Sequence, residues 1–207
     1  MLLLNLMKYP RLSRDFYLRP TLEIAKSLLG KFLVHEYNGK KIGGMIVETE
    51  AYVGTKDRAA HSYGGRKTNR NEIEYGIGGH VYIYLVYGLH LQLNFVTAGM
   101  DEPECVLIRA LEPSDGIDLM KKLRKTHNET NLTNGPGKLC QALNLNKSLN
   151  GHDLCEKGSH FYIEDRGIKV PLKDIKKGPR IGIDYAGPYW SKIHWRFWVK
   201  DNLFVSK

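Results

Sequence analysis

Cysteine is scarce in this chain. Its 207 residues include only three cysteines, Cys105, Cys140 and Cys155, and no two of them have CxxC spacing. An odd number of cysteines without such spacing argues against a disulfide framework and predicts reduced thiols. The cysteines also form no standard zinc-ligand pattern with His152 and His160. We therefore expect neither disulfides nor a bound metal.

Long apolar runs are also missing. No stretch approaches the roughly 20 apolar residues that span a bilayer. The apolar start MLLLNLM is too short for the core of a secretory signal and has no basic region before it. Internal repeats and low-complexity tracts are absent as well. We expect a protein without a membrane partner that stays in the cytoplasm, associated with the nucleoid if the organism is bacterial.

Acidic residues are outnumbered by basic ones. The chain has 31 Lys and Arg against 22 Asp and Glu, a formal net charge of +9. Such an excess favours a polyanionic partner, because cationic side chains release the counterions condensed on nucleic acid. The composition, 42% hydrophobic and 26% charged, is ordinary for a folded protein. At this length we expect one domain that spans residues 1–207.

The spacing of apolar residues predicts both helices and strands. TLEIAKSLLG, residues 21–30, has helical spacing between a capping threonine and a terminal glycine. Residues 31–37 and 41–53 are typical of strands joined by the turn Asn38-Gly39. Strands and helices do not alternate regularly, which favours an α+β domain. The remaining predictions are strands at 105–113, 161–170, 179–186 and 195–199 and helices at 114–125 and 135–145.

The motif ETEAYVGTKDRAAH begins in the second of these strands. Strand alternation places Glu48, Glu50 and Tyr52 on one face, together with Ile46. An ionised glutamate that deprotonates a water molecule suits hydrolysis of a glycosidic bond, because the sugar develops positive charge. Glu48 could instead pair with Arg109, the one charge in an apolar strand, and both glutamates could simply lie on a solvated strand face.

The segment VYIYLVYGLHLQLNFV predicts a β-hairpin with Tyr87-Gly88 at its tip. One face of its first strand is apolar, and the other carries Tyr82 and Tyr84. A tyrosine at the tip cannot bury its ring in the core of its own sheet. It could enter the base stack of a duplex in place of a base that has swung outward. The alternative is that Tyr87 packs on a neighbouring loop.

The segment between these motifs, residues 54–80, is longer than most loops of compact domains and is therefore functional or disordered. Its basic stretch GGRKTNRN is either a phosphate-contacting loop or a solvated charged loop. Tyr52, His61 and Tyr84 could enclose an extruded base, and aromatic faces attract alkylated purines because these bases carry positive charge. Alone, His61 is more typical of a structural histidine.

Seven segments in order resemble a single family. They are AKSLLGKFLV, IVETEAYVG, AAHSYGG, VYIYLVYG, VLIRALEP, NGPGKLCQAL and PRIGI, and they extend from about Phe16 to Phe197. An ordered set of this size is far more specific than one short motif. The chain resembles the alkyladenine, or 3-methyladenine, DNA glycosylases.

This resemblance implies a monofunctional enzyme without a metal or an organic cofactor. Such an enzyme flips a damaged purine out of double-stranded DNA and hydrolyses its N-glycosidic bond, which leaves an abasic site in an uncut strand. We accordingly expect a monomer that binds DNA containing damaged purines. The expected fold is a single α+β domain with a curved, mainly antiparallel sheet, flanking helices and a protruding β-hairpin.

The resemblance also implies roles for individual residues. Glu50 is expected to be the general base that activates water, and Tyr87 the wedge that fills the vacated stack. Tyr52, His61 and Tyr84 are expected to form the walls of the base pocket, where Asn94 would discourage the amino group of normal guanine. The expected contacts to the DNA backbone or to the flipped nucleotide are Thr68, Arg70, Arg109 and Lys138.

The chain departs from the family pattern at two places. Glu74-Tyr75 stands where many members have Met-Phe, and we expect Glu74 to add negative charge near the DNA side. Leu89-His90 in the hairpin also differs from some relatives. Two other functions remain open at this point. One is a noncatalytic nucleic-acid-binding module, and the other is a carbohydrate hydrolase with Glu48 and Glu50 as its acid and base.

Overall fold

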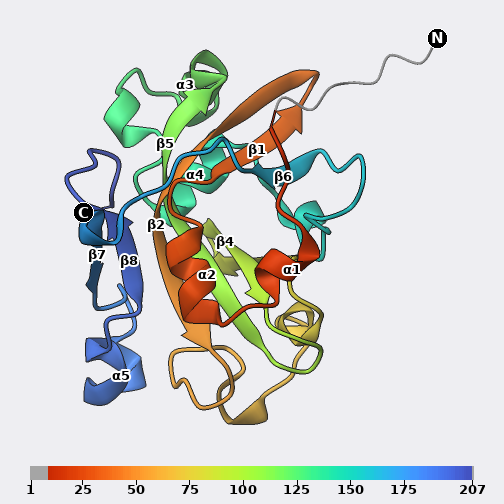
Figure 1. Cartoon of the computed structure of the whole chain (residues 1–207), viewed down its shortest axis with the longest axis vertical. Coiled ribbons are helices and arrows are strands. Elements are labelled where there is room, and N and C mark those ends of the chain that lie inside the picture. The colour runs from red at the N-terminus through yellow and green to blue at the C-terminus, as the bar shows by residue number, and fades with distance from the viewer. Residues whose placement is uncertain (1–8, 207) are drawn as a thin grey trace.

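The computed structural model describes residues 9–206, which form a single α+β unit built on one sheet (Figure 1). The strand order is β3-β4-β5-β2-β1-β6, and β8 pairs with both β2 and β7. Every pairing is antiparallel, as expected from the sequence. The strands are β1 Phe32–Tyr37, β2 Lys40–Val53, β3 Val81–Val86, β4 His90–Thr97, β5 Glu104–Asp115, β6 Phe161–Glu164, β7 Ile175–Gly178 and β8 Arg196–Val199.

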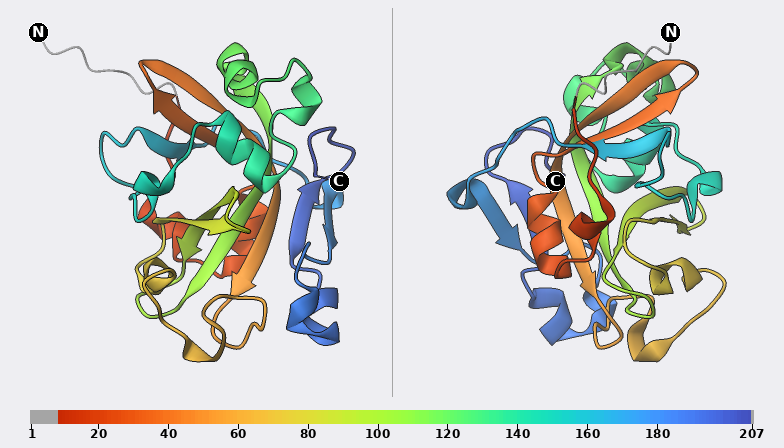
Figure 2. Two further views of the ribbon diagram at one scale, coloured as in Figure 1. Left: turned by 180° about the vertical axis from the view of Figure 1, so that it is seen from behind. Right: turned by 45° about the vertical axis from the view of Figure 1, so that its right-hand side comes forward.

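The long strand β2 organises the sheet. One of its edges pairs with β5 along most of its length, while the other pairs first with β1 and then with β8. The sheet is curved, and the two views of Figure 2 show how the direction of the strands changes across it. Helix α2 packs against β2 and β5, and α4 packs against β4 and β5. The helices are α1 Arg14–Tyr17, α2 Thr21–Ser27, α3 Ile117–Arg124, α4 Pro136–Ala142 and α5 Pro188–Lys192.

Helix α2 confirms the predicted amphipathic helix and corrects its cap. Ile24 and Leu28 are buried in the main hydrophobic core, with Val106 of β5 and Leu139 of α4. Pro20, not a threonine, precedes the first turn. The Oγ1 of Thr21 lies instead 2.6 Å from the Oγ1 of Thr97 and donates to Glu104, so its side chain joins α2 to the ends of β4 and β5.

The C-terminal part differs most from the prediction. The strand expected over 161–170 ends at Glu164, and residues 179–186 are not a strand. They form bends followed by a 3₁₀ helix, Asp184–Ala186, and Gly182 has a φ of 76°, outside the extended region. The extended strands here are β7, which the sequence patterns did not indicate, and β8, which they did.

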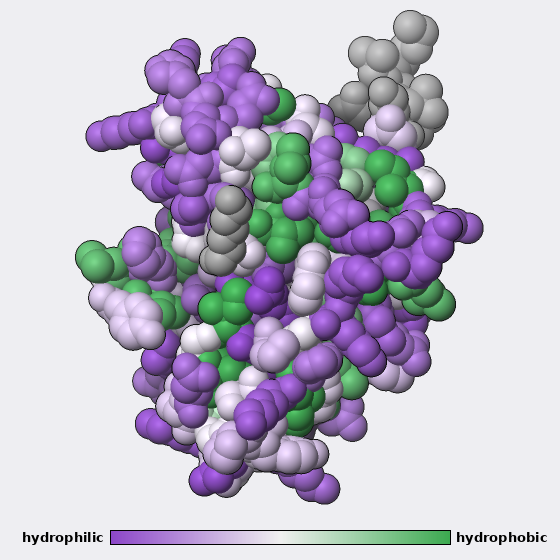
Figure 3. All heavy atoms as spheres, turned by 90° about the vertical axis from the view of Figure 1, so that its left-hand side faces the viewer, coloured by the Kyte–Doolittle hydropathy of each residue, from purple (hydrophilic) through white to green (hydrophobic). Residues whose placement is uncertain are grey.

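The face that carries β7 and β8 is largely hydrophilic, and its apolar residues occur in separate patches (Figure 3). None of the helices in residues 9–206 is long and apolar enough to cross a membrane. Within the same residues no cluster of His, Cys, Asp or Glu side chains could hold a metal ion. All three cysteines are free, and Cys105 and Cys140 are buried.

Candidate active site

Four neighbouring strands build one face of the site. Tyr82 of β3 pairs with Asn94 of β4, Asn94 pairs with Leu107 of β5, and Leu107 pairs with Glu50 of β2. Directly paired residues of antiparallel strands point to the same face of the sheet. This row therefore presents a tyrosine, an asparagine and a glutamate on one side. The next row along continues the same face with Cys105 and Tyr52, which are paired with each other.

A small cavity lies over this face, and its empty volume of about 290 Å³ includes space that is open to solvent. The four residues predicted for the base pocket, Tyr52, His61, Tyr84 and Asn94, all line it. Residues far apart in the sequence are thus brought together as expected. The long segment 54–80, which supplies His61, closes one side. The complete lining is Tyr52, Ala59, His61, Glu74, Tyr82, Tyr84, Asn94, Cys105 and Tyr185.

The rings of the cavity are held by contacts with one another. His61 Nδ1 lies 2.7 Å from the hydroxyl oxygen of Tyr82, and the imidazole meets the ring of Tyr84 edge to face with centroids 4.6 Å apart. The hydroxyl of Tyr84 donates to Gln92 Oε1 at 2.7 Å. Burial lowers the pKa of His61 to about 4, and the charges of Arg70 and Arg66 act in the same direction. His61 is therefore uncharged at neutral pH.

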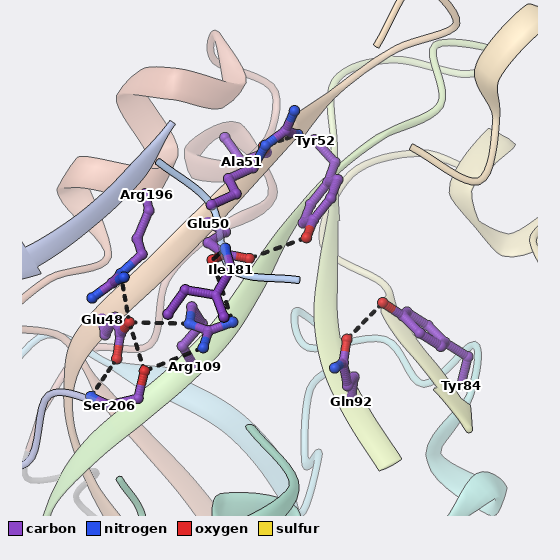
Figure 4. A network of polar contacts seen from close by, with 11 residues as sticks. Glu48, Glu50, Ala51, Tyr52, Tyr84, Gln92, Arg109, Ile181, Arg196 and Ser206 are labelled. Atoms are coloured by element: carbon purple, nitrogen blue, oxygen red, sulfur yellow. Dashed lines mark hydrogen bonds and ion pairs between the residues drawn. The ribbon is translucent and has the colours of Figure 1, made fainter. Parts of the chain in front are cut away.

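Glu50 lies beneath the cavity and is completely buried. Its Oε1 accepts the backbone N–H of Ile181 at 2.8 Å and lies 3.3 Å from Nη1 of Arg109, and its Oε2 accepts the hydroxyl of Tyr52 at 3.0 Å (Figure 4). Burial raises the pKa of Glu50, whereas Arg109, Ile181 and Tyr52 act in the opposite direction. Glu50 does not itself line the cavity, but Tyr52 connects it to the cavity directly.

Two β-bulges aim Arg109 at the glutamates. The pairing of β2 with β5 passes over Val47 and then over Arg109, and bulges of this kind redirect side chains next to active sites. Arg109 is buried, and its Nε lies 3.0 Å from Oε1 of Glu48. The bulge also corrects a sequence prediction. Ile46 does not share the glutamate face but belongs to the main core with Ala51, because the extra residue at Val47 reverses the alternation.

Glu48 uses both of its oxygens in contacts with the protein. Besides Arg109, its Oε1 lies 2.8 Å from Nε of Arg196 and accepts the hydroxyl of Ser206 at 2.9 Å, and its Oε2 accepts the backbone N–H of Ser206 at 2.7 Å. The predicted alternative of a Glu48 to Arg109 pair is confirmed. A solvated strand face is wrong for both glutamates, since neither is exposed to solvent.

The hairpin tip is the most exposed aromatic feature of the described chain. Tyr87 is 88% exposed, so packing on a neighbouring loop is wrong for this residue. Tyr87 and Gly88 have φ values of 51° and 70°, and the N–H of Leu89 donates to the carbonyl of Val86, as in a type I′ turn. A tyrosine in this left-handed region costs roughly 1–2 kcal/mol, and such strain is concentrated at functional sites.

Comparison with known proteins identifies the family of the chain. A family model described as methylpurine-DNA glycosylase matches residues 15–203. The chain belongs to this family. A relative from Desulfitobacterium hafniense is 47% identical over 204 residues, which is 95% of this chain and 98% of the relative. Another from Clostridium novyi is 49% identical over 205 residues, with 95% and 98% covered. Both are provisionally named 3-methyladenine DNA glycosylases.

Membership of the methylpurine-DNA glycosylase family makes this protein a DNA repair enzyme that hydrolyses N-glycosidic bonds. Its expected DNA-contacting residues differ in their surroundings. Arg70 is exposed, donates to the carbonyl of Leu85 at 3.3 Å and lies 5.0 Å above the ring of Tyr84, between the cavity and the hairpin tip. Arg109, in contrast, contacts Glu48, Glu50 and Ser206.

Thr68 and Lys138 of this glycosylase both hydrogen-bond to asparagines. Thr68 donates from its backbone N and its hydroxyl to Oδ1 of Asn71, at 2.7 and 2.8 Å. Lys138 Nζ donates to Asn131 and Asn134 at 2.6 and 2.9 Å. These bonds fix the two side chains in place, and their predicted roles toward DNA remain predictions.

Glu74 of the glycosylase lies inside the cavity rather than on the open surface of the protein. Its side chain is only 2% exposed and lines the cavity. The residue lies in a 3₁₀ helix, Glu72–Tyr75, whose buried residues are Glu74 and Tyr75. Sequence alone could not show this, because a short helix within a long loop carries no periodic pattern that defines its buried side.

Several further residues of the glycosylase site escaped the sequence analysis. Arg180 forms a buried pair with Asp57 through Nη1 to Oδ2 at 2.5 Å and Nη2 to Oδ1 at 2.9 Å, and it lies 4.7 Å over the ring of Tyr52. This pair holds the neighbouring N–H of Ile181 against Glu50. The strand predicted over residues 179–186 gave no indication of the Arg180 to Asp57 pair. The cavity residues without an expected role are Ala59, Tyr82, Cys105 and Tyr185.

Proposed function

We propose that this protein removes alkylated purines such as 3-methyladenine from double-stranded DNA by flipping the damaged base into the cavity and hydrolysing its N-glycosidic bond. The observation that carries the proposal is the 3.0 Å hydrogen bond from Tyr52 to Glu50, which links a buried carboxylate to a cavity lined by rings. The product is an abasic site in an uncut strand. The names of the relatives support the same substrate class.

Glu50 acts as the general base in this proposal. It takes a proton from a water molecule whose oxygen bonds to C1′ of the deoxyribose, while the electron pair of the C1′–N bond leaves with the purine. A raised pKa makes the carboxylate a stronger base, and Arg109 and Ile181 stabilise its ionised form. A cationic alkylated purine departs as a neutral base, so this reaction needs no second proton donor.

The cavity receives the base and the hairpin occupies its former place. Tyr52, His61 and Tyr84 form the walls, and the uncharged state of His61 avoids repulsion of a cationic purine. Asn94 is the residue that we assign to discourage the amino group of normal guanine. The exposed Tyr87 enters the stack, where it compensates for unstacking that costs a few kcal/mol.

Basic and polar side chains provide the contacts to the DNA backbone in this proposal. We assign Thr68, Arg70 and Lys138 to phosphates beside the flipped nucleotide, and Arg109 to the sugar side, where it also holds Glu50. The net charge of +9 supports this polyanionic partner. We further propose that the protein acts as a monomer, in the cytoplasm where bacterial DNA lies.

The deciding experiment is Glu50→Gln. This variant keeps the size of the side chain but cannot accept the proton, so base release from methylated duplex DNA should fall at least about 100-fold while binding to that DNA is retained. Released bases are identified by chromatography. Glu72→Gln, at an exposed position, is the matched control and should release bases at the parental rate. Full activity of Glu50→Gln would overturn the assignment.

The same experiment addresses the two other functions. A noncatalytic module would bind DNA and release no base. A carbohydrate hydrolase would need Glu48 as its acid, but Glu48 is completely buried, and its partners Arg109, Arg196 and Ser206 do not line the cavity. That arrangement disfavours the third possibility.

A further inference from the structure

Glu74 is a carboxyl group on the wall of the cavity. Its backbone N–H donates to the carbonyl of Asn71 at 3.0 Å, within the 3₁₀ helix. The preceding residue, Ile73, packs against the buried cluster of Tyr82, Val96 and Cys105 on the sheet. These two anchors turn the side chain of Glu74 inward, so that it lines the cavity together with Asn94 and Cys105.

The carboxyl group of Glu74 has few partners for its depth. Its Oε1 accepts a weak hydrogen bond from the thiol of Cys105 at 3.4 Å. Its Oε2 is buried and has no hydrogen-bond partner, and no cation in residues 9–206 forms an ion pair with it. Burying such a group is costly, and an apolar side chain of similar length would fill the space without that cost.

The environment of Glu74 differs from that of Glu50. Burial raises the pKa of Glu74 to about 7, and the hydrogen bonds of Cys105 and Asn71 and the charge of Arg70 act in the opposite direction. The other cavity side chains, Tyr52, Tyr82, Tyr84, Tyr185 and the neutral His61, add no positive charge at neutral pH. A positive charge that entered the cavity would thus be the first strong partner of this carboxyl group.

We propose that Glu74 selects cationic bases, because its unpaired carboxyl oxygen pairs with the positive charge that alkylation places on a purine ring. The inference rests on the proposed function of the cavity as the base pocket. A neutral lesion such as hypoxanthine brings no such charge and gains nothing from an anion. Glu74 is therefore a specificity-determining residue for positively charged substrates.

The positive charge moves during the reaction, and its position determines which step Glu74 affects. Before cleavage the positive charge lies on the purine, close to Glu74. As the C1′–N bond breaks, the base becomes neutral and the positive charge moves to the sugar, on the side of Glu50. Interactions that are stronger in the bound substrate than in the transition state increase affinity without increasing the rate of the chemical step. Glu74 consequently strengthens capture of the flipped base, and Glu50 accelerates its release.

Binding measurements in a catalytically silenced protein test this inference. The background is Glu50→Gln, and the probes are one duplex with a single 7-methylguanine, the same duplex with hypoxanthine at that position, and the undamaged duplex. Adding Glu74→Gln should weaken binding to the 7-methylguanine duplex about tenfold, as expected for the loss of one moderate ionic contact. Binding to the other two duplexes should change less than about twofold.

Control variants separate charge from folding. Glu74→Met removes the charge at similar length and should repeat the selective loss, while Glu72→Gln on the exposed side of the same 3₁₀ helix should bind all three duplexes like the background. Equal losses for the three duplexes, or no loss for 7-methylguanine with a folded Glu74→Met protein, would overturn the inference.

Failure of the inference is distinguishable from failure of the proposed function. If the parental protein releases no base from dimethyl-sulfate-treated DNA, the proposed function is wrong. If it releases methylated purines while the Glu74 variants keep the parental preference between 7-methylguanine and hypoxanthine, only the selection by Glu74 is wrong.

Discussion

Glu50 and Glu74 are both buried carboxyl groups, but only Glu50 lies beside a cation. Arg109 is 3.3 Å from Glu50, whereas Glu74 accepts the weak thiol donor of Cys105 at 3.4 Å and forms no ion pair within residues 9–206. The ionised form of Glu50 is therefore supported by the folded protein itself. The ionised form of Glu74 has no such cation beside it until a charged ligand binds. Glu74 therefore destabilises the folded state of the free enzyme.

The loss of folding stability that Glu74 causes depends on pH and can be measured. The pKa of Glu74 is about 7 in the folded protein, against an ordinary value of 4.5. Between these values the folded state binds more protons than the unfolded state, so the free energy of unfolding falls as the pH rises. From pH about 5 to about 8, the parental protein should lose about 2–3 kcal/mol relative to Glu74→Gln.

Urea unfolding of the two proteins at both pH values measures this difference. Other titrating groups contribute equally to the two proteins and cancel in the comparison. A gap between Glu74→Gln and the parental protein that stays constant over this range would contradict a raised pKa for Glu74.

At the scale of secondary structure, regular strands place the base pocket and an irregular segment completes it. Alternation correctly placed Tyr82 and Tyr84 on one face of β3, and Glu48 and Glu50 on one face of β2. Period-two patterns are local, so one sequence suffices to read them. The bulges at Val47 and Arg109 were not predictable, since no local pattern marks an extra residue.

The parts of the site that were missed depend on long-range pairs. Glu74 faces the sheet because Ile73 packs on β3 and β5, and the N–H of Ile181 reaches Glu50 from a position 131 residues later in the chain. The apolar alternation of residues 179–186 is typical of a strand, but the buried pair of Arg180 with Asp57 prevails over it. Such tertiary contacts override local propensity.

The Arg180 to Asp57 pair should be essential for the segment 54–80. Arg180→Met leaves the carboxylate of Asp57 buried without its partner, which should reduce the free energy of unfolding by about 3–5 kcal/mol. Hydrogen exchange in residues 54–80 should also accelerate, because Asp57 anchors that segment. Lys177→Met, at an exposed position of β7, is the control and should change stability by less than about 0.5 kcal/mol.

Thermal unfolding monitored by circular dichroism measures the change in stability. Hydrogen exchange detected by mass spectrometry measures the exchange rates of residues 54–80. A melting temperature of Arg180→Met equal to that of Lys177→Met would show that this pair does not anchor the segment.

On the scale of the whole molecule, the chain combines an excess of basic residues with the exposed Tyr87 at the hairpin tip. The charge of +9 favours binding to any DNA, whereas in the proposed function Tyr87 acts only where a base leaves the stack. These two contributions differ in their response to salt, because counterion release depends on phosphate contacts and stacking does not.

Two substitutions should separate the contributions. Tyr87→Ser should weaken binding to lesion-containing DNA while the slope of log K against log salt stays at the parental value. Arg70→Gln should weaken binding to damaged and undamaged DNA alike and reduce the slope by about one. Fluorescence anisotropy over a series of salt concentrations measures both. An altered slope for Tyr87→Ser, or unchanged lesion affinity, would remove the wedge from this account.

The left-handed backbone at Tyr87 has a consequence for engineering. Glycine adopts a φ of 51° without steric cost, so Tyr87→Gly should make the turn more favourable. A directed-evolution campaign that rewarded only heat resistance would therefore enrich glycine at this position and collect robust proteins that can no longer hold a damaged base outside the helix.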